Sequence, residues 1–222
     1  MSAGAVFITG TDTGVGKTRV AQALLRAHVA AGRRAVGMKP VAAGIEPGEE
    51  VNADVAALAR AGNVDAPLAD RNPYAFAPAV APHLAAAATG VAIDLAAIAA
   101  AYARLAARAD VVIVEGAGGA LVPLDARHDM LDVALCLRLP VLLVVGLRVG
   151  CLNHAFLSER AIRARGLVLA GWVANAIGPG MVLQDENVAA LSRRLAAPCI
   201  AVVEHGAFAQ LPSPWLPGVE PC

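Results

Sequence analysis

The stretch FITGTDTGVGKT, residues 7–18, decides the fold of this chain. An apolar run at residues 5–9 predicts a buried strand before it, and a helix is expected to begin at Lys17. A glycine-rich turn between a strand and a helix is the setting in which a GxxxxGK[ST] loop binds phosphate. Its backbone N–H groups point at phosphate oxygens, and the helix N-terminus adds positive potential. The stretch therefore predicts a phosphate-binding loop.

Individual positions of this loop have predicted roles. Gly16 lets the backbone approach the ligand, Lys17 reaches the β- and γ-phosphates, and the Thr18 hydroxyl is a candidate Mg²⁺ ligand. The first motif position is Thr11, with Gly10 one residue earlier. The alternative is a glycine-rich turn with a chance GKT, which the flanking strand and helix make the weaker interpretation.

Short apolar runs alternate along the chain with longer helical stretches. Runs that are apolar on both faces are typical of a parallel sheet covered by helices. Strands are expected at residues 5–9, 34–38, 111–115, 141–145, 169–174 and 199–203, and helices at residues 17–31, 95–108, 152–165 and 184–195. The alternation predicts an α/β fold with a doubly wound, mainly parallel sheet and helices on both faces, of the P-loop NTPase type.

We interpret residues 1–222 as a single domain. Residues 42–90 are less regular, with a short helix near residues 54–61, and are expected to form an elaborated crossover over the carboxyl edge of the sheet. The end of the chain, about residues 210–222, contains four prolines and is expected to be extended.

Composition argues for a small-molecule partner. The formal net charge is zero, so bulk electrostatics favour neither a nucleic acid nor a membrane surface as partner. The longest stretch without charge, residues 72–93, contains three prolines and Gly90, which disfavours a membrane-spanning helix. The sequence shows no secretory signal and no CxxC pair, so we expect a soluble, cytoplasmic protein.

Lysine is rare in this chain. Of 18 lysines and arginines, only Lys17 and Lys39 are lysines. A compact ammonium is not easily replaced by a planar guanidinium, so lysine is expected to persist where geometry requires it. Lys39 follows the second expected strand, at the edge where open α/β sheets bind ligands. It is a candidate second ammonium beside the γ-phosphate; the alternative is an ordinary solvated lysine.

Two carboxylates are candidate metal ligands. Glu115 ends the strand at residues 111–115 beside the phosphate loop, where a Mg²⁺-coordinating acid is expected. The alternative is a cap for the glycine turn that follows. Asp54 heads a helix-like stretch, so helix capping is as natural a role as metal binding. The five histidines show no metal-ligand spacing, and no transition-metal site is expected.

Several segments, in their order and spacing, resemble the dethiobiotin synthetase family. They are FITGTDTGVGKT, GMKPVAAG, NPYAF with APH, VVIVEGAGG, LPVLLVVGLRVGCLNHA and LAGWVAN, within residues 5–176. The resemblance implies an ATP-dependent ligase of biotin biosynthesis that uses ATP and Mg²⁺. CO₂ and one amine of 7,8-diaminononanoate form a carbamate, whose oxygen attacks the γ-phosphate. The second amine then closes the ureido ring, giving dethiobiotin, ADP and phosphate.

The resemblance also implies roles for particular residues. The catalytic residues would be Lys39, Lys17 and Thr13. The metal ligands would be Thr18, Asp54 and Glu115. Nucleotide contacts, with Asn175 at the adenine, would come from Gly14, Val15, Gly16, Lys17, Thr18, Arg19, Asp54, Glu115, Gly116, Ala117, Gly118, Asn175 and Ala176. Substrate contacts would come from Lys39 and, across the interface of a homodimer with its active site near that interface, from Gly150, Cys151, Leu152 and Asn153.

Three departures from the family pattern and one alternative function stay open. Gly14 stands where members often have glutamate, and Ala43 replaces the serine of KPVxSG. The C-terminal adenine contact falls either at residues 204–206 or at the Pro-Trp-Leu of residues 214–216. The alternative function is a P-loop switch ATPase of the partition or septum-positioning type. Such proteins typically carry lysine where this chain has Asp12, which argues against that interpretation.

Overall fold

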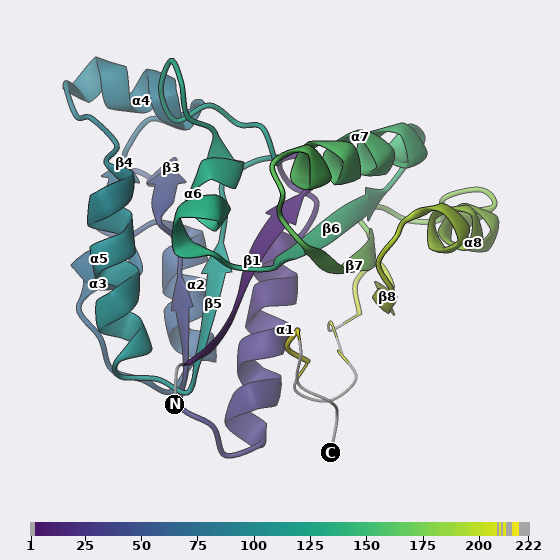
Figure 1. Ribbon diagram of the computed structural model, residues 1–222, viewed down its shortest axis with the longest axis horizontal. Helices are drawn as coiled ribbons and strands as arrows, with labels where there is room; N and C mark the ends of the chain where they lie inside the picture. Colours follow the sequence, from purple (N-terminus) through teal and green to yellow (C-terminus); the bar gives the residue numbers. More distant parts are fainter. Residues whose placement is uncertain (1–2, 208, 210, 212–214, 218–222) are drawn as a thin grey trace.

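A computed structural model describes residues 3–207, 209, 211 and 215–217 of the chain. Its centre is a sheet with the strand order β2-β5-β1-β6-β7-β8, in which every neighbouring pair is parallel (Figure 1). The strands are β1 (Gly4–Gly10), β2 (Ala35–Met38), β5 (Val111–Glu115), β6 (Val141–Leu147), β7 (Leu169–Ala176) and β8 (Cys199–Val203). The predicted parallel sheet is thereby confirmed, with each strand end within two residues of its expected position.

Alternating side chains of the central strand explain why helices cover both faces. Phe7 packs into a buried cluster with α5 (Leu95–Ala106) and α6 (Met130–Leu137). Ile8 points the other way, into a cluster with α1 (Lys17–Ala30) and α2 (Ala53–Ala61). The predicted coverage of both faces is therefore confirmed.

The outer part of the sheet has its own cluster of buried side chains. The helices α7 (Cys151–Ala164) and α8 (Gln184–Arg194) pack there against side chains of β6 and β7. The largest of these is Trp172, which is fully buried. Helices thus cover both faces of the centre of the sheet and one side of its outer part (Figure 1).

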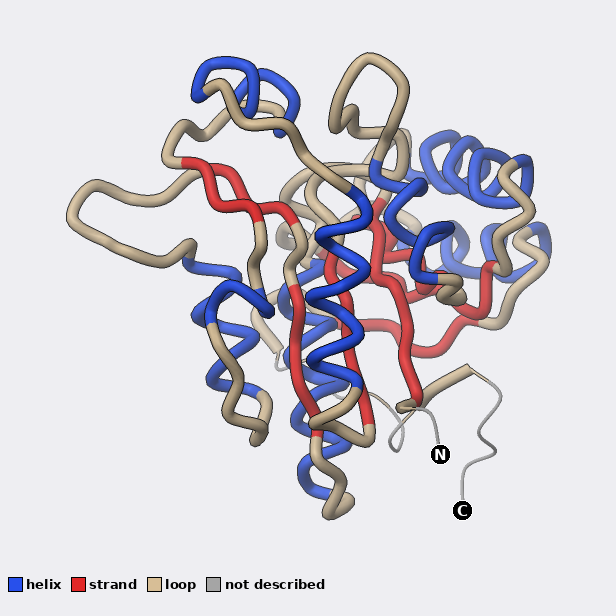
Figure 2. Tube along the Cα trace, turned by 60° about the vertical axis from the view of Figure 1, so that its left-hand side comes forward, coloured by secondary structure: helices blue, strands red, loops and turns tan. Residues whose placement is uncertain are grey.

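The segment between β2 and β5 holds more regular structure than the sequence predicts. Two strands of three residues each, β3 (Val41–Ala43) and β4 (Tyr74–Phe76), form a small parallel sheet of their own (Figure 2). Such short strands carry no periodicity that a sequence pattern can reveal. The helices α2 and α3 (Leu68–Arg71) lie between them in the chain.

The proline-rich stretch after β4 contains a helix that was not predicted, α4 (Pro82–Thr89). Pro82 lies in its first turn, where the missing N–H costs no helical hydrogen bond. Pro82 is therefore compatible with the start of this helix. Among the described residues, no helix combines the length and the apolar character that crossing a membrane requires.

Trp215 and Leu216 of the C-terminal segment lie at the amino edge of the sheet. Leu216 is buried, and a Cβ on Gly4 would lie 2.8 Å from its Cδ1 atom. Trp215 lies beside Gly171, near the start of β7. Leu216 and Trp215 are thus at the opposite edge of the sheet from the phosphate loop and cannot reach a nucleotide there. Pro214, and most of the tail that we expected to be extended, lie outside the described residues.

A buried histidine makes the stability of the fold depend on pH. His28 of α1 is inaccessible to solvent, and burial lowers its pKa from 6.5 to about 4. The unfolded chain therefore binds a proton below pH 6.5 that the folded protein excludes, and stability falls as the pH drops towards 4. By pH 5 we expect this group to remove about 2 kcal/mol of the free energy of unfolding.

Denaturant unfolding at pH 7 and pH 5 checks this expectation. His28→Leu should lose less stability than the wild type over this range, because leucine takes up no proton. His205→Leu, at an exposed position, should behave as the wild type does. If wild type and His28→Leu lose equal stability, His28 is not the group responsible.

Candidate active site

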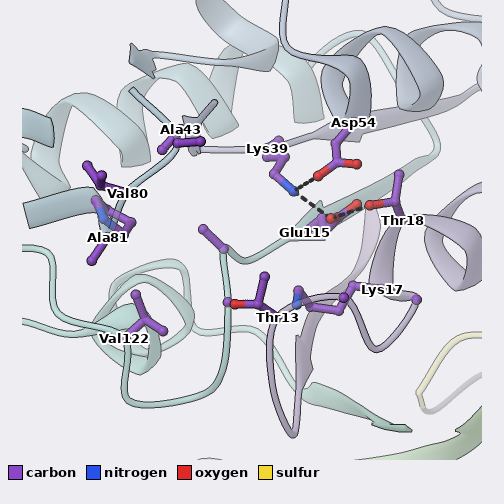
Figure 3. A pocket seen from close by; sticks show the side chains of 16 residues that line it. Thr13, Lys17, Thr18, Lys39, Ala43, Asp54, Val80, Ala81, Glu115 and Val122 are labelled. Carbon is purple, nitrogen blue, oxygen red and sulfur yellow. Dashed lines mark hydrogen bonds and ion pairs between the residues drawn. The ribbon is translucent and has the colours of Figure 1, made fainter. Parts of the chain in front are cut away.

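The carboxyl ends of β1, β2 and β5 border a cavity of about 600 Å³ (Figure 3). Parallel strands place their carboxyl ends at one edge of the sheet, so segments distant in sequence meet there. The predicted site residues that line this cavity are Thr13, Gly14, Gly16, Lys17, Thr18, Lys39, Asp54, Glu115, Ala117 and Gly118. The structure thus brings the phosphate loop, the second lysine and both candidate carboxylates together.

The phosphate loop offers unpaired backbone donors to this cavity. Gly16 is the N-cap of α1, with a φ of 92°, and no side chain caps the helix. The N–H groups of residues 14–19 donate a hydrogen bond to no described residue. Lys17 Nζ donates to the carbonyl oxygen of Asp12 at 3.0 Å, which holds the ammonium beside these donors. The arrangement is a binding site for an anion.

A buried ion cluster lies next to the loop. Lys39 Nζ is 2.5 Å from Asp54 Oδ2 and 2.7 Å from Glu115 Oε1 (Figure 3). Thr18 Oγ1 donates to the same Glu115 oxygen at 2.8 Å. Lys39 is 5% exposed and Glu115 is inaccessible, so neither charge is solvated by bulk water. Lys39 is therefore not the solvated lysine that the sequence left as an alternative.

Burial and charge act differently on the two lysines. Burial opposes the charge of Lys39, but the carboxylates of Glu115 and Asp54 outweigh it and raise its pKa above the ordinary value. Burial lowers the pKa of Lys17 to about 8, and the nearby Lys39 ammonium adds to this shift. Burial of Asp54 opposes its charge, yet Lys39 holds its pKa below the usual value. Lys39 thus stays charged at neutral pH, while the pKa of Lys17, about 8, lies closer to neutral pH.

Helix capping, an alternative role for Asp54, is performed by another residue. Asn52 is the N-cap of α2, and its side chain accepts from the Asp54 N–H at 3.0 Å. The Asn52 side-chain amide also donates to the Gly44 carbonyl at 2.7 Å. Because capping is already provided, the Asp54 carboxylate is available to the cavity. For Glu115, the partners among the described residues are Lys39 and Thr18, not the glycine turn that follows it.

The donor set fits a hard cation. Glu115 Oε2 is buried and has no hydrogen-bond partner among the described residues, although its neighbour Oε1 has two. An oxygen ligand set of two carboxylates and a hydroxyl suits Mg²⁺, which usually takes its remaining ligands from phosphate and water. In the part of the chain that the structure describes, no group of three His, Cys, Asp or Glu side chains forms a protein-only metal cage.

Other predicted nucleotide residues lie behind the cavity wall. Val15 is buried, and its methyl groups fill the space above Gly10 and Gly146. Gly116 has no room for a side chain, because a Cβ would lie 2.9 Å from Phe7. The remaining predicted nucleotide residues that do not line the cavity are Arg19, Asn175 and Ala176.

The predicted substrate segment also lies outside this cavity within one chain. Gly150 is the N-cap of α7, and no side chain caps that helix. Cys151 is 1% exposed and packs into the cluster beneath α7, so its side chain is directed into its own subunit. Of the predicted segment, Asn153 has an exposed side chain.

Sequence reasoning missed two features of the site. An apolar wall faces the phosphate loop and is made by Ala43, Ala79, Val80, Ala81, Pro82 and Val122. The proline-rich composition of residues 78–82 gave only a weak signal for it. The second feature is an ion pair between Asp12 and Arg148, which connects the phosphate loop to the turn before α7. Pairing across that distance in sequence leaves no local pattern.

Comparisons with known proteins match most of the chain. A family model described as an AAA domain matches residues 4–207. A protein of Aromatoleum aromaticum named ATP-dependent dethiobiotin synthetase BioD is 56% identical over 91% of this chain and 91% of its own length. Proteins of the same name from Nitrosospira multiformis and Xanthomonas euvesicatoria are 52% and 48% identical, over 90% and 97% of this chain and 87% and 93% of their own lengths.

Solved structures with the same fold are more distant in sequence. A MinC:MinD cell division protein complex of Aquifex aeolicus matches with a TM-score of 0.58 and 16% identity, over 91% of this chain and 81% of that one. A ParA family ATPase of Chlorobium tepidum matches with a TM-score of 0.56 and 11% identity, over 92% and 84%. At such low identity these matches establish the fold alone. The relatives of high identity establish more: the chain belongs to the dethiobiotin synthetase family.

Proposed function

We propose that this chain is an ATP-dependent dethiobiotin synthetase, a ligase of biotin biosynthesis. It joins CO₂ to 7,8-diaminononanoate, phosphorylates the carbamate and closes the ureido ring. The observation that carries the proposal is the buried, charged Lys39 held beside the phosphate loop. The names and high identity of the relatives support the same activity.

Most of this catalysis is positioning and electrostatic stabilisation, as in other phosphoryl transfers. Lys17 and the free N–H groups of residues 14–19 would hold the triphosphate. Lys39 would stabilise the carbamate and the negative charge that develops between it and the γ-phosphate. Because Asp54 and Glu115 raise its pKa, Lys39 acts as a fixed positive charge and not as a proton acceptor. Thr13, exposed at the cavity rim, would add a hydroxyl near the transferred phosphate.

Magnesium fits the ligands Thr18, Asp54 and Glu115, of which Glu115 has one buried oxygen without a partner among the described residues. When bound there, Mg²⁺ would neutralise phosphate charge. The chain's own contribution is to hold these oxygens on three separate segments that meet beside Lys39.

The substrate would lie across the cavity from the nucleotide. Its methylene chain suits the apolar wall, and Ala43 offers no hydroxyl there. We propose that its carboxylate binds at residues 150–153 of a second subunit in a homodimer, since this segment does not line the cavity of its own chain. Val149 and Leu157, 92% and 55% exposed beside this segment, support a covered surface here. A cytoplasmic location remains a prediction.

A switch ATPase is the weaker alternative. The ParA and MinD structures share the fold, but not the sequence identity of the dethiobiotin synthetases. Such switches typically have lysine where this chain has Asp12. Here Asp12 forms an ion pair with Arg148, so a lysine at that position would face a like charge. The surroundings of position 12 therefore favour the Asp12 carboxylate over a lysine.

The first test measures phosphate release from the purified protein with Mg-ATP. We expect release only when both 7,8-diaminononanoate and bicarbonate are present, because the γ-phosphate is transferred to a carbamate. Each co-substrate is omitted in turn as the control. Release that is indifferent to both would support the switch ATPase and exclude the synthetase.

The second test concerns Lys39. Lys39→Arg should lower turnover by about 100-fold or more, because a planar guanidinium cannot occupy the same point between two carboxylates. The Kd for Mg-ATP should change little, since the phosphate loop is intact. Arg108→Lys, a conservative change at an exposed position, is the control and should keep wild-type turnover. Normal turnover in Lys39→Arg would remove this residue from the mechanism.

The third test uses the lowered pKa of Lys17, about 8. An anionic ligand needs the ammonium form, so affinity should be constant below pH 8 and fall above it. Between pH 7 and pH 9 we expect the Kd for Mg-ATP to rise about tenfold. Lys17→Ala should bind weakly with no such dependence, while a flat profile for the wild type would contradict the assignment.

A further inference from the structure

Asn175, which the family resemblance places at the adenine, contacts the phosphate loop directly. Its Nδ2 donates to the Val15 carbonyl at 2.8 Å, and the residue is 2% exposed. The amide also lies against Gly16, where a Cβ would be 2.2 Å from Nδ2. Asn175 therefore touches two consecutive residues of the loop from the end of β7.

The hydrogen bond to Val15 fixes the direction of the next N–H group. In a planar trans peptide the carbonyl and the N–H point in opposite directions. Asn175 holds the Val15 carbonyl on its own side, so the N–H of Gly16 points away from β7. Gly16 lines the cavity, and its N–H has no partner among the described residues. Asn175 thus orients the Gly16 N–H, one of the donors of the phosphate loop.

Arg19 fixes the orientation of the Asn175 amide. Its Nη1 donates to Asn175 Oδ1 at 3.2 Å, and its Nη2 donates to the Glu204 carbonyl at 3.1 Å. If the amide turned over, its NH₂ would face the guanidinium and its oxygen would face the Val15 carbonyl. Both contacts would be repulsive, so only one orientation satisfies the two partners.

We propose that Arg19 and Asn175 are positioning residues that orient the N–H donors of the phosphate loop. They therefore govern affinity for the polyphosphate and not only for the base. Arg19 holds the amide, the amide holds the Val15 carbonyl, and the carbonyl directs the Gly16 N–H. The proposal rests on the nucleotide site proposed above, but not on the chemistry of the substrate.

A ligand without a base tests this directly. Equilibrium binding of Mg-ATP and of Mg-tripolyphosphate is measured for the wild type and Asn175→Ala, without diamine or bicarbonate. Loss of one orienting hydrogen bond should weaken tripolyphosphate binding about tenfold and ATP binding by at least that factor. Weaker ATP binding with unchanged tripolyphosphate binding would make Asn175 a reader of the base alone, and unchanged binding of both would also overturn the proposal.

Arg19→Met supplies a second arm that keeps Asn175 in place. It should weaken the binding of both tripolyphosphate and ATP, by a smaller factor than Asn175→Ala does. The Asn175 amide stays in place and loses only the hydrogen bond from Arg19. Arg26→Met is the matched control, since Arg26 is an exposed arginine two turns further along α1 that contacts Gln22. An Arg19→Met protein with wild-type tripolyphosphate affinity would contradict the role of Arg19, even if Asn175→Ala failed to fold.

These measurements are separate from the test of the proposed function. Phosphate release that did not require diamine would exclude the proposed synthetase function. The binding data would still decide the roles of Arg19 and Asn175. Conversely, a synthetase with diamine-dependent release can bind tripolyphosphate normally after these substitutions, and then only the positioning proposal fails.

Discussion

The buried ammonium of Lys39 is the constraint on which the site depends. A charge that is removed from water must be paired, because leaving it alone costs several kcal/mol. Its partners Asp54 and Glu115 come from the start of α2 and the end of β5, while Lys39 itself follows β2. These three segments therefore cannot move apart without leaving a buried charge unpaired. The shape of the cavity depends on this ion cluster.

The surrounding structure is arranged so that this cluster meets the phosphate loop. Asn52 caps α2 and is tied to the Gly44 carbonyl, which fixes the start of the helix that carries Asp54. By contrast, α1 begins at Gly16 without a side-chain cap and leaves its first N–H groups free for a ligand. Of these two helices, the one that positions the Asp54 carboxylate is capped, and the one that begins at the phosphate loop is not.

Much of this arrangement could be predicted from the sequence, because the strands are buried on both faces and the phosphate loop is a local motif. Lys39 and Glu115 could be placed because each follows or ends such a strand. Some of what could not be predicted depends on contacts between distant residues, such as the pairing of Asp12 with Arg148. The capping of α2 is local, but Asn52 and Asp54 are both common N-cap residue types, so the pattern did not decide between them. The strands β3 and β4 are too short to show a periodic signal, and the proline-rich stretch before α4 showed no helical pattern, although Pro82 lies in the first turn of that helix.

The contact between Leu216 and the first strand has a consequence for how the chain acquires its structure. Leu216 belongs to the same buried cluster as Val6 and Leu25, near the opposite end of the sequence. Contacts between residues so far apart form late, because a long loop must close before they contribute. On the ribosome, β1 and α1 emerge long before Leu216, so this part of their buried cluster stays open to water until residue 216 has been made. A nascent chain therefore exposes apolar side chains of β1 and α1 that Leu216 covers only later.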